Sequence, residues 1–134
     1  MDIGFAFICD YAELGTKINA LGIGFDTIHA QQVPATHPHF YLVAQIRASV
    51  AEVGDKAIEI RLIDADGVDV IPAINGTFNI PRPPPGATES LGRILVALNN
   101  VQFPRFTQYS LHVVIQGREM VRIPLRVMQP PATA

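Results

Sequence analysis

Tyr109 to Val127 read YSLHVVIQGREMVRIPLRV, and this stretch contains the clearest strand signals in the chain. Every second residue in each half of it is apolar: Tyr109, Leu111, Val113, Ile115, then Val121, Ile123, Leu125 and Val127. A side-chain period of two is typical of a β-strand with one buried face. The stretch therefore predicts a β-hairpin whose two apolar rows face one core.

The loop of this hairpin sets its register. A plain two-residue loop would set charged residues opposite apolar ones, because a one-residue slip moves every side chain to the other face. Two arrangements keep the apolar rows together. In one, a three-residue loop over 117–119 pairs Ile115 with Val121; in the other, a tight Gln-Gly turn is followed by a β-bulge. Pro124 faces outward in both and donates no ladder hydrogen bond, so we expect an edge or a bulge there.

Apolar alternation recurs along the rest of the chain between turn signals. We expect strands over 3–9, 17–30, 40–50, 57–63 and 93–99, and one or two short strands over 68–80. The one helix-like fragment is Tyr-Ala-Glu-Leu, within residues 10–15. Seven or eight strands at this spacing, without a long helix, predict an all-β fold. We interpret it as an antiparallel, immunoglobulin-like β-sandwich of Greek-key type.

The turn between two of these strands has a clear signature. Asp64-Ala-Asp-Gly67 suits a three-residue hairpin loop, because glycine readily takes the left-handed conformation that closes it. That loop sets Leu62 opposite Val70 and keeps one face apolar. Asp64, Asp66 and Asp69 lack the spacing of an EF-hand, so we prefer the turn to a cation site.

Length and composition limit the class of protein. A chain of 134 residues is the size of one domain, and we expect it to span residues 1–129, with 130–134 as a frayed tail. Charged residues make up 16% of the chain, against about 25% in ordinary domains, so the surface is short of charge. The single cysteine, Cys9, excludes an internal disulfide, and its aromatic strand predicts a buried thiol.

The sequence also bears on location and partners. No segment approaches the ~20 apolar residues that span a bilayer, and the first residues carry acid where a secretory signal needs basic charge. We therefore expect a cytoplasmic protein that does not bind membranes. A net charge of −2 with ten basic residues disfavours nucleic acid as a partner.

No motif in the chain points to catalysis. His37 and His39 lie on one side of an extended segment, but a zinc site needs about three or four ligands. A nucleophile motif, a phosphate-binding loop and paired carboxylates are all missing from the sequence. We expect no catalytic residue, no cofactor and no metal, while the sequence leaves open whether the histidines or the three aspartates ever bind one.

Apolar residues occupy outward positions of the predicted sheets as well as inward ones. Antiparallel sheets usually present polar residues to water, and a contiguous apolar patch marks an interface. The predicted interaction face, rimmed by arginines, consists of Tyr41, Val43, Arg93, Leu95, Val114, Arg122 and Arg126. We expect another subunit, or an unknown protein partner, to cover it.

Three functional hypotheses follow. The favoured one is a non-catalytic binding module that self-associates through its apolar sheet face. The alternative is a small-molecule or anion-binding protein whose pocket lies among the loops around His37, Pro83 and Asn100. A metal-dependent enzyme is the least favoured of the three.

Four segments resemble an uncharacterised bacterial family of small standalone β-sandwich proteins, a domain of unknown function. They are FAFICDYAEL at 5–14, LGIGFDTI at 21–28, LIDADG at 62–67 and FPRFTQYSLHVVIQGREMVRIPLRV at 103–127. The resemblance implies a bacterial cytoplasmic sandwich and supplies no catalytic residue. Such sandwiches often have a Pro-x-x-Gly-x-Tyr-like corner before the last hairpin; here Pro104 and Tyr109 are present and the glycine is not.

Overall fold

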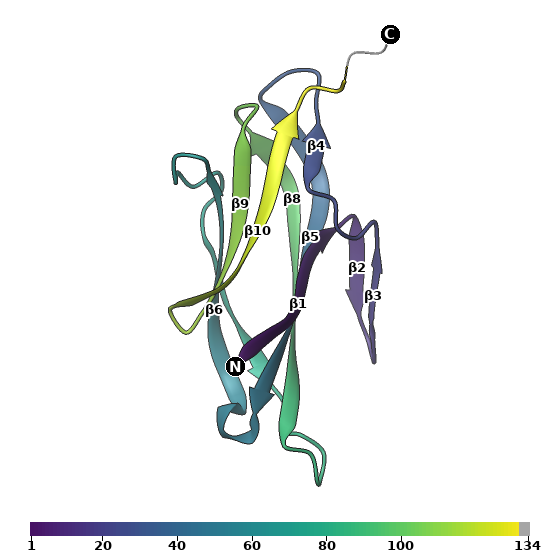
Figure 1. Ribbon diagram of the computed structural model, residues 1–134, viewed down its shortest axis with the longest axis vertical. Helices are drawn as coiled ribbons and strands as arrows, with labels where there is room; N and C mark the ends of the chain where they lie inside the picture. The colour runs from purple at the N-terminus through teal and green to yellow at the C-terminus, as the bar shows by residue number, and fades with distance from the viewer. Residues whose placement is uncertain (132–134) are drawn as a thin grey trace.

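The computed structural model describes residues 1–131, and ten strands run through that part of the chain (Figure 1). The strands are β1 (Asp2–Cys9), β2 (Tyr11–Leu14), β3 (Ile18–Leu21), β4 (Thr27–His29), β5 (Ala35–Ser49), β6 (Gly54–Asp64), β7 (Ile74–Ile80), β8 (Glu89–Phe103), β9 (Gln108–Ile115) and β10 (Arg118–Met128). One short 3₁₀ helix, η1 (Val50–Glu52), follows β5. The all-β class is confirmed. None of the helical structure in residues 1–131 has the length and apolar character to cross a membrane.

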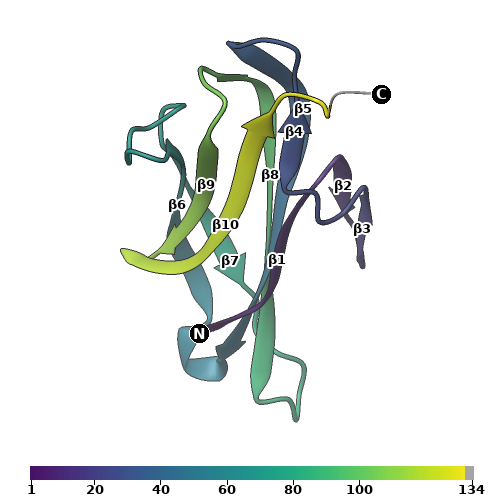
Figure 2. The same cartoon turned by 45° about the horizontal axis from the view of Figure 1, so that its top comes forward.

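The strands form three sheets. One has the order β1-β5-β8, a second has the order β4-β10-β9-β6-β7, and β2 pairs with β3 as a separate hairpin. The neighbours are antiparallel except for β4, which runs parallel to the end of β10. Figures 1 and 2 show the β2–β3 hairpin standing to one side of β1.

A single core lies between the two larger sheets. Its fully buried members include Phe40, Leu42 and Ile46 from β5, and Leu62 and Leu111 from the facing sheet. Fully burying one such side chain contributes about 1.5–3 kcal/mol. The alternation along β5, β6 and β9 therefore predicts the core correctly, because each second residue points into it.

The decisive hairpin follows the turn-and-bulge arrangement. Gln116 and Gly117 form the loop with φ of 52° and 76°, and Ile115 lies opposite Arg118. The register shifts between Glu119 and Val121, which restores the apolar pairing. Pro124 is exposed, and β4 pairs with β10 over 126–128 and not beside the proline. The expected edge at that position is confirmed.

Residues 11–29 correct the sequence reading in two ways. The helix-like Tyr-Ala-Glu-Leu fragment is strand β2, and the single strand expected over 17–30 divides into β3 and β4. These short strands raise the number above the seven or eight expected. Packing overrides local preference here, because Ala12 of β2 is buried against the outer side of the β1-β5-β8 sheet.

The chain end is described up to Pro131. Pro130 and Pro131 have no regular structure, and residues 132–134 of the expected tail lie outside the described residues.

Candidate functional site

The outer side of the β1-β5-β8 sheet is rich in apolar side chains. The register places Phe7, Val43 and Leu95 in one cross-strand row, and the next rows continue the pattern. The outward residues that make up this surface, called here the apolar face, are Phe5, Phe7, Cys9, Tyr41, Val43, Leu91, Leu95 and Ala97. Water-facing antiparallel sheets are normally polar on this side, so the face needs a cover.

The β2–β3 hairpin covers the centre of the apolar face. Cys9 and Val43 are completely buried beneath it, and Ala12 of the hairpin completes this small second core. Burial raises the pKa of the Cys9 thiol, and the Asp10 charge adds to that effect. Cys9 is therefore a buried thiol, as its aromatic strand predicts, and not an accessible nucleophile.

Arg93 fixes the hairpin to the sheet beneath it. Its Nη1 donates to the carbonyl oxygen of Thr16, in the hairpin turn, at 3.0 Å, and its Nε donates to Gln45 Oε1 at 3.4 Å. The ring of Tyr11 in β2 packs edge-on against Tyr41 with 5.5 Å between centroids. Arg93, which we expected at the rim of an interface with a partner, thus binds the β2–β3 hairpin of the same chain.

Part of the apolar face remains uncovered. Phe5 is 38% exposed and shares a cross-strand row with Gln45 and Arg93, and Leu91 is 42% exposed and lies opposite Arg47. Leu14, beside the hairpin turn that Arg93 holds, is 47% exposed. Phe5 also stacks on Phe7, with 5.8 Å between the ring centroids. The hairpin therefore leaves three apolar side chains exposed on or beside this face: Phe5, Leu14 and Leu91.

The outer side of the five-stranded sheet is polar. Its rows cross β6, β9 and β10, with Arg61 and Arg122 on either side of His112. The outward residues that make up this surface, called here the polar face, are Glu59, Arg61, Ile63, Ser110, His112, Val114, Glu119, Arg122, Pro124 and Arg126. Arg61 forms an ion pair with Asp69 at 3.1 Å, so the face satisfies part of its own charge.

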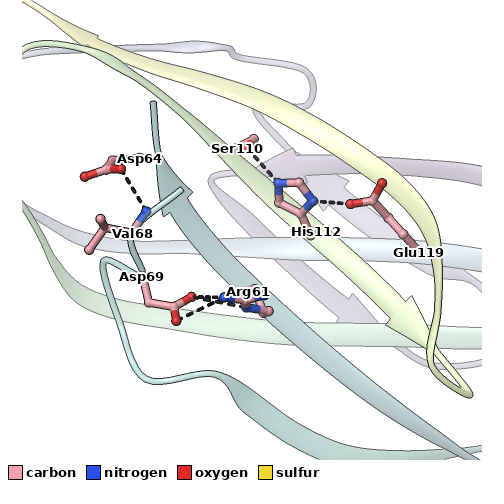
Figure 3. A network of polar contacts seen from close by, with 7 residues as sticks. All are labelled: Arg61, Asp64, Val68, Asp69, Ser110, His112 and Glu119. Atoms are coloured by element: carbon pink, nitrogen blue, oxygen red, sulfur yellow. Dashed lines mark hydrogen bonds and ion pairs between the residues drawn. The ribbon is translucent and has the colours of Figure 1, made fainter. Parts of the chain in front are cut away.

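Three side chains of the polar face form a hydrogen-bonded relay (Figure 3). Ser110 and His112 are two residues apart on β9, so both point outward, and Ser110 Oγ lies 2.8 Å from His112 Nε2. The other ring nitrogen, Nδ1, contacts Glu119 Oε1 beside the bulge of β10. A carboxylate only accepts hydrogen bonds, so the neutral ring carries its proton on Nδ1 and accepts from the Ser110 hydroxyl.

Burial and charge reinforce this relay. His112 is 7% exposed, an unusual position for an outward-facing imidazole. The hydrogen bond from His112 is the main cause that lowers the pKa of Glu119; partial burial opposes it and Arg122, 3.3 Å away, assists. The relay thus has a serine hydroxyl, a base oriented by hydrogen bonds at both nitrogens, and an ionised carboxylate.

The structure divides the interaction face that the sequence predicts. Tyr41, Val43, Arg93 and Leu95 lie on the apolar face, and Val43 is covered by the hairpin. Val114, Arg122 and Arg126 lie on the polar face, on the other side of the molecule's core. The seven residues do not form one surface. Alternation along a strand tells inward from outward, but it does not tell which sheet the strand joins.

His37, Pro83 and Asn100 do not lie around one pocket: His37 lines one pocket of about 500 Å³, and Pro83 lines another of about 590 Å³. His37 pairs with Val101 at one end of the long β5–β8 ladder, beside Asn100, whereas Ser49 pairs with Glu89 at the other end. Pro83 lies in the loop between β7 and β8 and lines a pocket together with Glu89, so it belongs to that second end. His37 and Ser49 are twelve residues apart on β5, and each residue of a strand advances about 3.3 Å, so the two ends lie about 40 Å apart.

The metal-ligating residues considered in the sequence have other roles. His37 is half-buried with its ring 5.5 Å from that of Phe40, and burial lowers its pKa. Asp64 forms the expected turn, accepting from the backbone N–H of Asp66 and Val68 at 2.9 and 3.0 Å. Its other oxygen accepts from Arg105 at 3.0 Å. Within residues 1–131, three or more His, Cys, Asp or Glu side chains nowhere gather into a metal site.

Sequence reasoning missed the Ser110–His112–Glu119 relay. The Ser-x-His spacing is visible in the sequence, but polar residues at alternate positions are what any solvated strand face presents. Glu119 comes from the next strand, and only the register with its bulge brings it to the histidine. The turn-and-bulge arrangement, followed residue by residue, places Glu119 opposite Val114, one cross-strand row from His112.

The chain was also compared with known proteins. The model of a family described as "Family of unknown function (DUF6941)" matches residues 4–128, from the first strand to the last residue of β10. A comparison with curated proteins gave no match.

Proposed function

The chain belongs to this family of unknown function, and we propose that it is a binding module that self-associates through the uncovered part of its apolar face. The observation that carries the proposal is that Phe5, Leu14 and Leu91 stay exposed on or beside a face whose centre is buried. Contiguous apolar surface on a sheet is typical of an interface.

The charged residues around the apolar face favour a second copy of the chain as the binding partner. Asp2 and Arg47 are cross-strand partners at one margin of the face, and Glu13 and Lys17 flank the hairpin turn at another. A twofold axis brings the same patch of two copies together, so a margin with both signs can pair with itself. A margin of one sign would repel its own copy and favour a partner of the opposite charge.

The area that a dimer buries must extend beyond these three side chains to the polar margin around them. A stable interface buries roughly 800 Å² on each partner. The chain exposes 7792 Å² in total, so a dimer needs about a tenth of that surface. Three apolar anchors with a mixed polar margin match the composition of such an interface, which has an apolar centre and a polar rim.

The proposal includes an immunoglobulin-like Greek-key sandwich. The order β4-β10-β9-β6-β7 facing β1-β5-β8 supports it, with the short β4 running parallel to β10. Tyr109 supports it as well, because its hydroxyl donates to the Arg105 carbonyl at 2.7 Å and accepts from the Arg105 N–H at 3.1 Å. A tyrosine that bonds back to the chain a few residues upstream is a corner found in such domains.

A cytoplasmic location and a bacterial origin are further parts of the proposal. A single buried cysteine with no disulfide is usual in reducing compartments.

Light scattering after size-exclusion chromatography tests the proposal directly. We expect a molar mass of twice the 14.6 kDa chain, retained at high salt because apolar contacts are not screened. Phe5→Ser should shift the mass toward one chain. Phe106→Ser is the matched control, since Phe106 is also 38% exposed but lies outside the apolar face. A wild-type monomer at high protein concentration would contradict self-association.

A further inference from the structure

The polar face contains a group that the proposed binding role does not use. Ser110 Oγ lies 2.8 Å from His112 Nε2, and Glu119 holds the opposite nitrogen of the same ring. An activated serine has this arrangement: its hydroxyl is within hydrogen-bonding distance of a base, and a third group orients that base. Such a relay is recognised by its geometry and not by its order in the sequence, so the lack of a known motif does not exclude it.

The relay opens onto a groove. The groove has a volume of about 570 Å³ and is lined by Asp64, Ser110, His112, Arg122 and Pro124, among others. Ser110 is half-buried, so its hydroxyl has both a fixed partner and access to the groove. His112 is nearly covered, which keeps water from competing for its ring nitrogens. A small molecule in the groove would therefore meet the serine before the histidine.

Positive charge stands on both sides of the relay histidine. Arg61 and Arg122 are the cross-strand neighbours of His112. Arg61 is committed to Asp69, with three hydrogen bonds of 3.1–3.2 Å. Arg122 contacts Glu119 through one nitrogen, has a side chain that is 64% exposed, and lines the groove. Arg122 is thus the cation placed to stabilise negative charge that develops on a bound carbonyl oxygen.

We propose that Ser110 is a base-activated nucleophile that accepts the acyl group of a small carboxylic ester bound in this groove. A bond forms between Ser110 Oγ and the carbonyl carbon as the hydroxyl proton moves to His112 Nε2. The carbon–oxygen bond of the ester then breaks, and the leaving alkoxide takes that proton from His112. Water attacks the acyl-serine in the same way, releasing the carboxylic acid and restoring the hydroxyl.

This inference does not depend on the proposed function. The relay lies on the polar face, and the self-association patch lies on the outer side of the opposite sheet. A monomeric protein with a reactive Ser110 would overturn the first and leave the second. A dimer with an inert Ser110 would do the reverse.

The test is covalent labelling of the full chain with a small fluorophosphonate, in which the serine oxygen displaces fluoride from phosphorus. The chain has three serines, at 49, 90 and 110, so intact mass followed by peptide mapping assigns the label. Ser49 is the built-in control, because it is exposed and hydrogen-bonded to Glu52 at 3.2 Å but has no imidazole partner. We expect the label on Ser110, and none on Ser49 over the same time.

Variants separate activation from simple exposure. Removing a general base typically costs about a hundredfold in rate, so His112→Gln should slow labelling by about that factor. Glu119 acts through the histidine as a positioning residue, and Glu119→Gln should slow labelling at least about tenfold. Nitrogen NMR of the ring should then show that the Nδ1–H form no longer dominates. This second variant alters a partly exposed side chain, so it carries the test if His112→Gln fails to fold.

A second readout uses p-nitrophenyl acetate. Acyl transfer to Ser110 predicts a burst of about one equivalent of p-nitrophenolate per chain, lost in Ser110→Ala. Labelling of Ser110 no faster than of Ser49 would overturn the inference. So would a labelling rate that His112→Gln and Glu119→Gln, both folded, leave unchanged.

Discussion

The outer faces of the two larger sheets differ in their side chains and in whether further structure covers them. Both are the outward rows of antiparallel strands, and both flank the single core between the larger sheets. The apolar face hides its centre under a hairpin of the same chain, whereas the polar face pairs its charges in place. The comparison shows that an outward row need not be a solvent-facing row. Its side chains decide whether the sheet gains another layer.

The difference has a physical origin in the pairs across each sheet. Phe7, Val43 and Leu95 share one row, and leaving such a row in water forfeits about 25 cal/mol for each Å² of apolar surface. The row of Arg61, His112 and Arg122 would instead lose hydration if it were covered. A cover is therefore favourable on the first face and costly on the second.

The largest effect should come from placing a charge under the hairpin. Val43 is completely buried on the apolar face, and Val114 is half-buried at an outward position of the polar face. We expect Val43→Lys to lower the free energy of unfolding by more than about 3 kcal/mol, because an unpaired charge would be buried. Val114→Lys, beside Glu59 and Glu119, should change it by less than about 1 kcal/mol. Urea denaturation measures both, and equal losses would erase the distinction between the faces.

A smaller effect should follow from disturbing the exit of the hairpin. Gly22 has a φ of 68°, and an added Cβ would lie 2.2 Å from Asp10 Oδ2. We expect Gly22→Ala to cost about 1–2 kcal/mol, since L-residues are disfavoured in the left-handed region. Hydrogen exchange should rise first in β2 and β3.

The matched control for this change is Gly15→Ala, in the turn of the same hairpin. A Cβ there would meet only the Lys17 carbonyl oxygen, at 3.8 Å. We expect a change within about 0.5 kcal/mol for this variant. If Gly22→Ala were equally mild, the hairpin would be a loose attachment and not the cover of the apolar face.

The smallest effect concerns acid and the polar face. The hydrogen bond from His112 is the main cause that lowers the pKa of Glu119 below its ordinary 4.5, and Arg122 adds to it. A carboxylate with a lowered folded-state pKa stabilises the fold above its unfolded-state pKa, and this contribution is lost as pH falls through the folded-state value. Thermal unfolding followed from neutral pH to below pH 4.5 should thus show a steeper acid loss in wild type than in Glu119→Gln. Parallel curves would mean that the relay contributes nothing to the stability of this face.

The sequence predicted much of the fold and little of the site. The alternation along β5, β6 and β9 identified the core, and Asp64 to Gly67 identified a turn that sets Leu62 opposite Val70, with the Val70 N–H donating to Leu62 at 2.8 Å. The turns and strands also indicated a family of unknown function, and the model of such a family matches residues 4–128. The β2 strand was misread as a helical turn, because four residues carry too little periodicity to outweigh the packing of Ala12.

The relay could not be predicted from the sequence, because the local position of each of its residues already accounts for a polar side chain there. In the sequence, Ser110 and His112 occupy the positions of a solvent-exposed strand face, and Glu119 occupies the position of a turn residue. Their contact depends on the β9–β10 register and on the bulge after Glu119. Likewise Tyr41 and Val114 look alike in sequence, yet they face away from each other on different sheets.

The all-β class, the inward rows and the tight turns could be predicted from the sequence, because period-two alternation and turn chemistry act between neighbouring residues. The tertiary structure alone decided which strands share a sheet, which outward row the β2–β3 hairpin covers, and that a serine, a histidine and a glutamate meet. These outcomes depend on contacts between distant segments. No local pattern encodes such contacts, because the same outward residue suits either sheet until the strands pair.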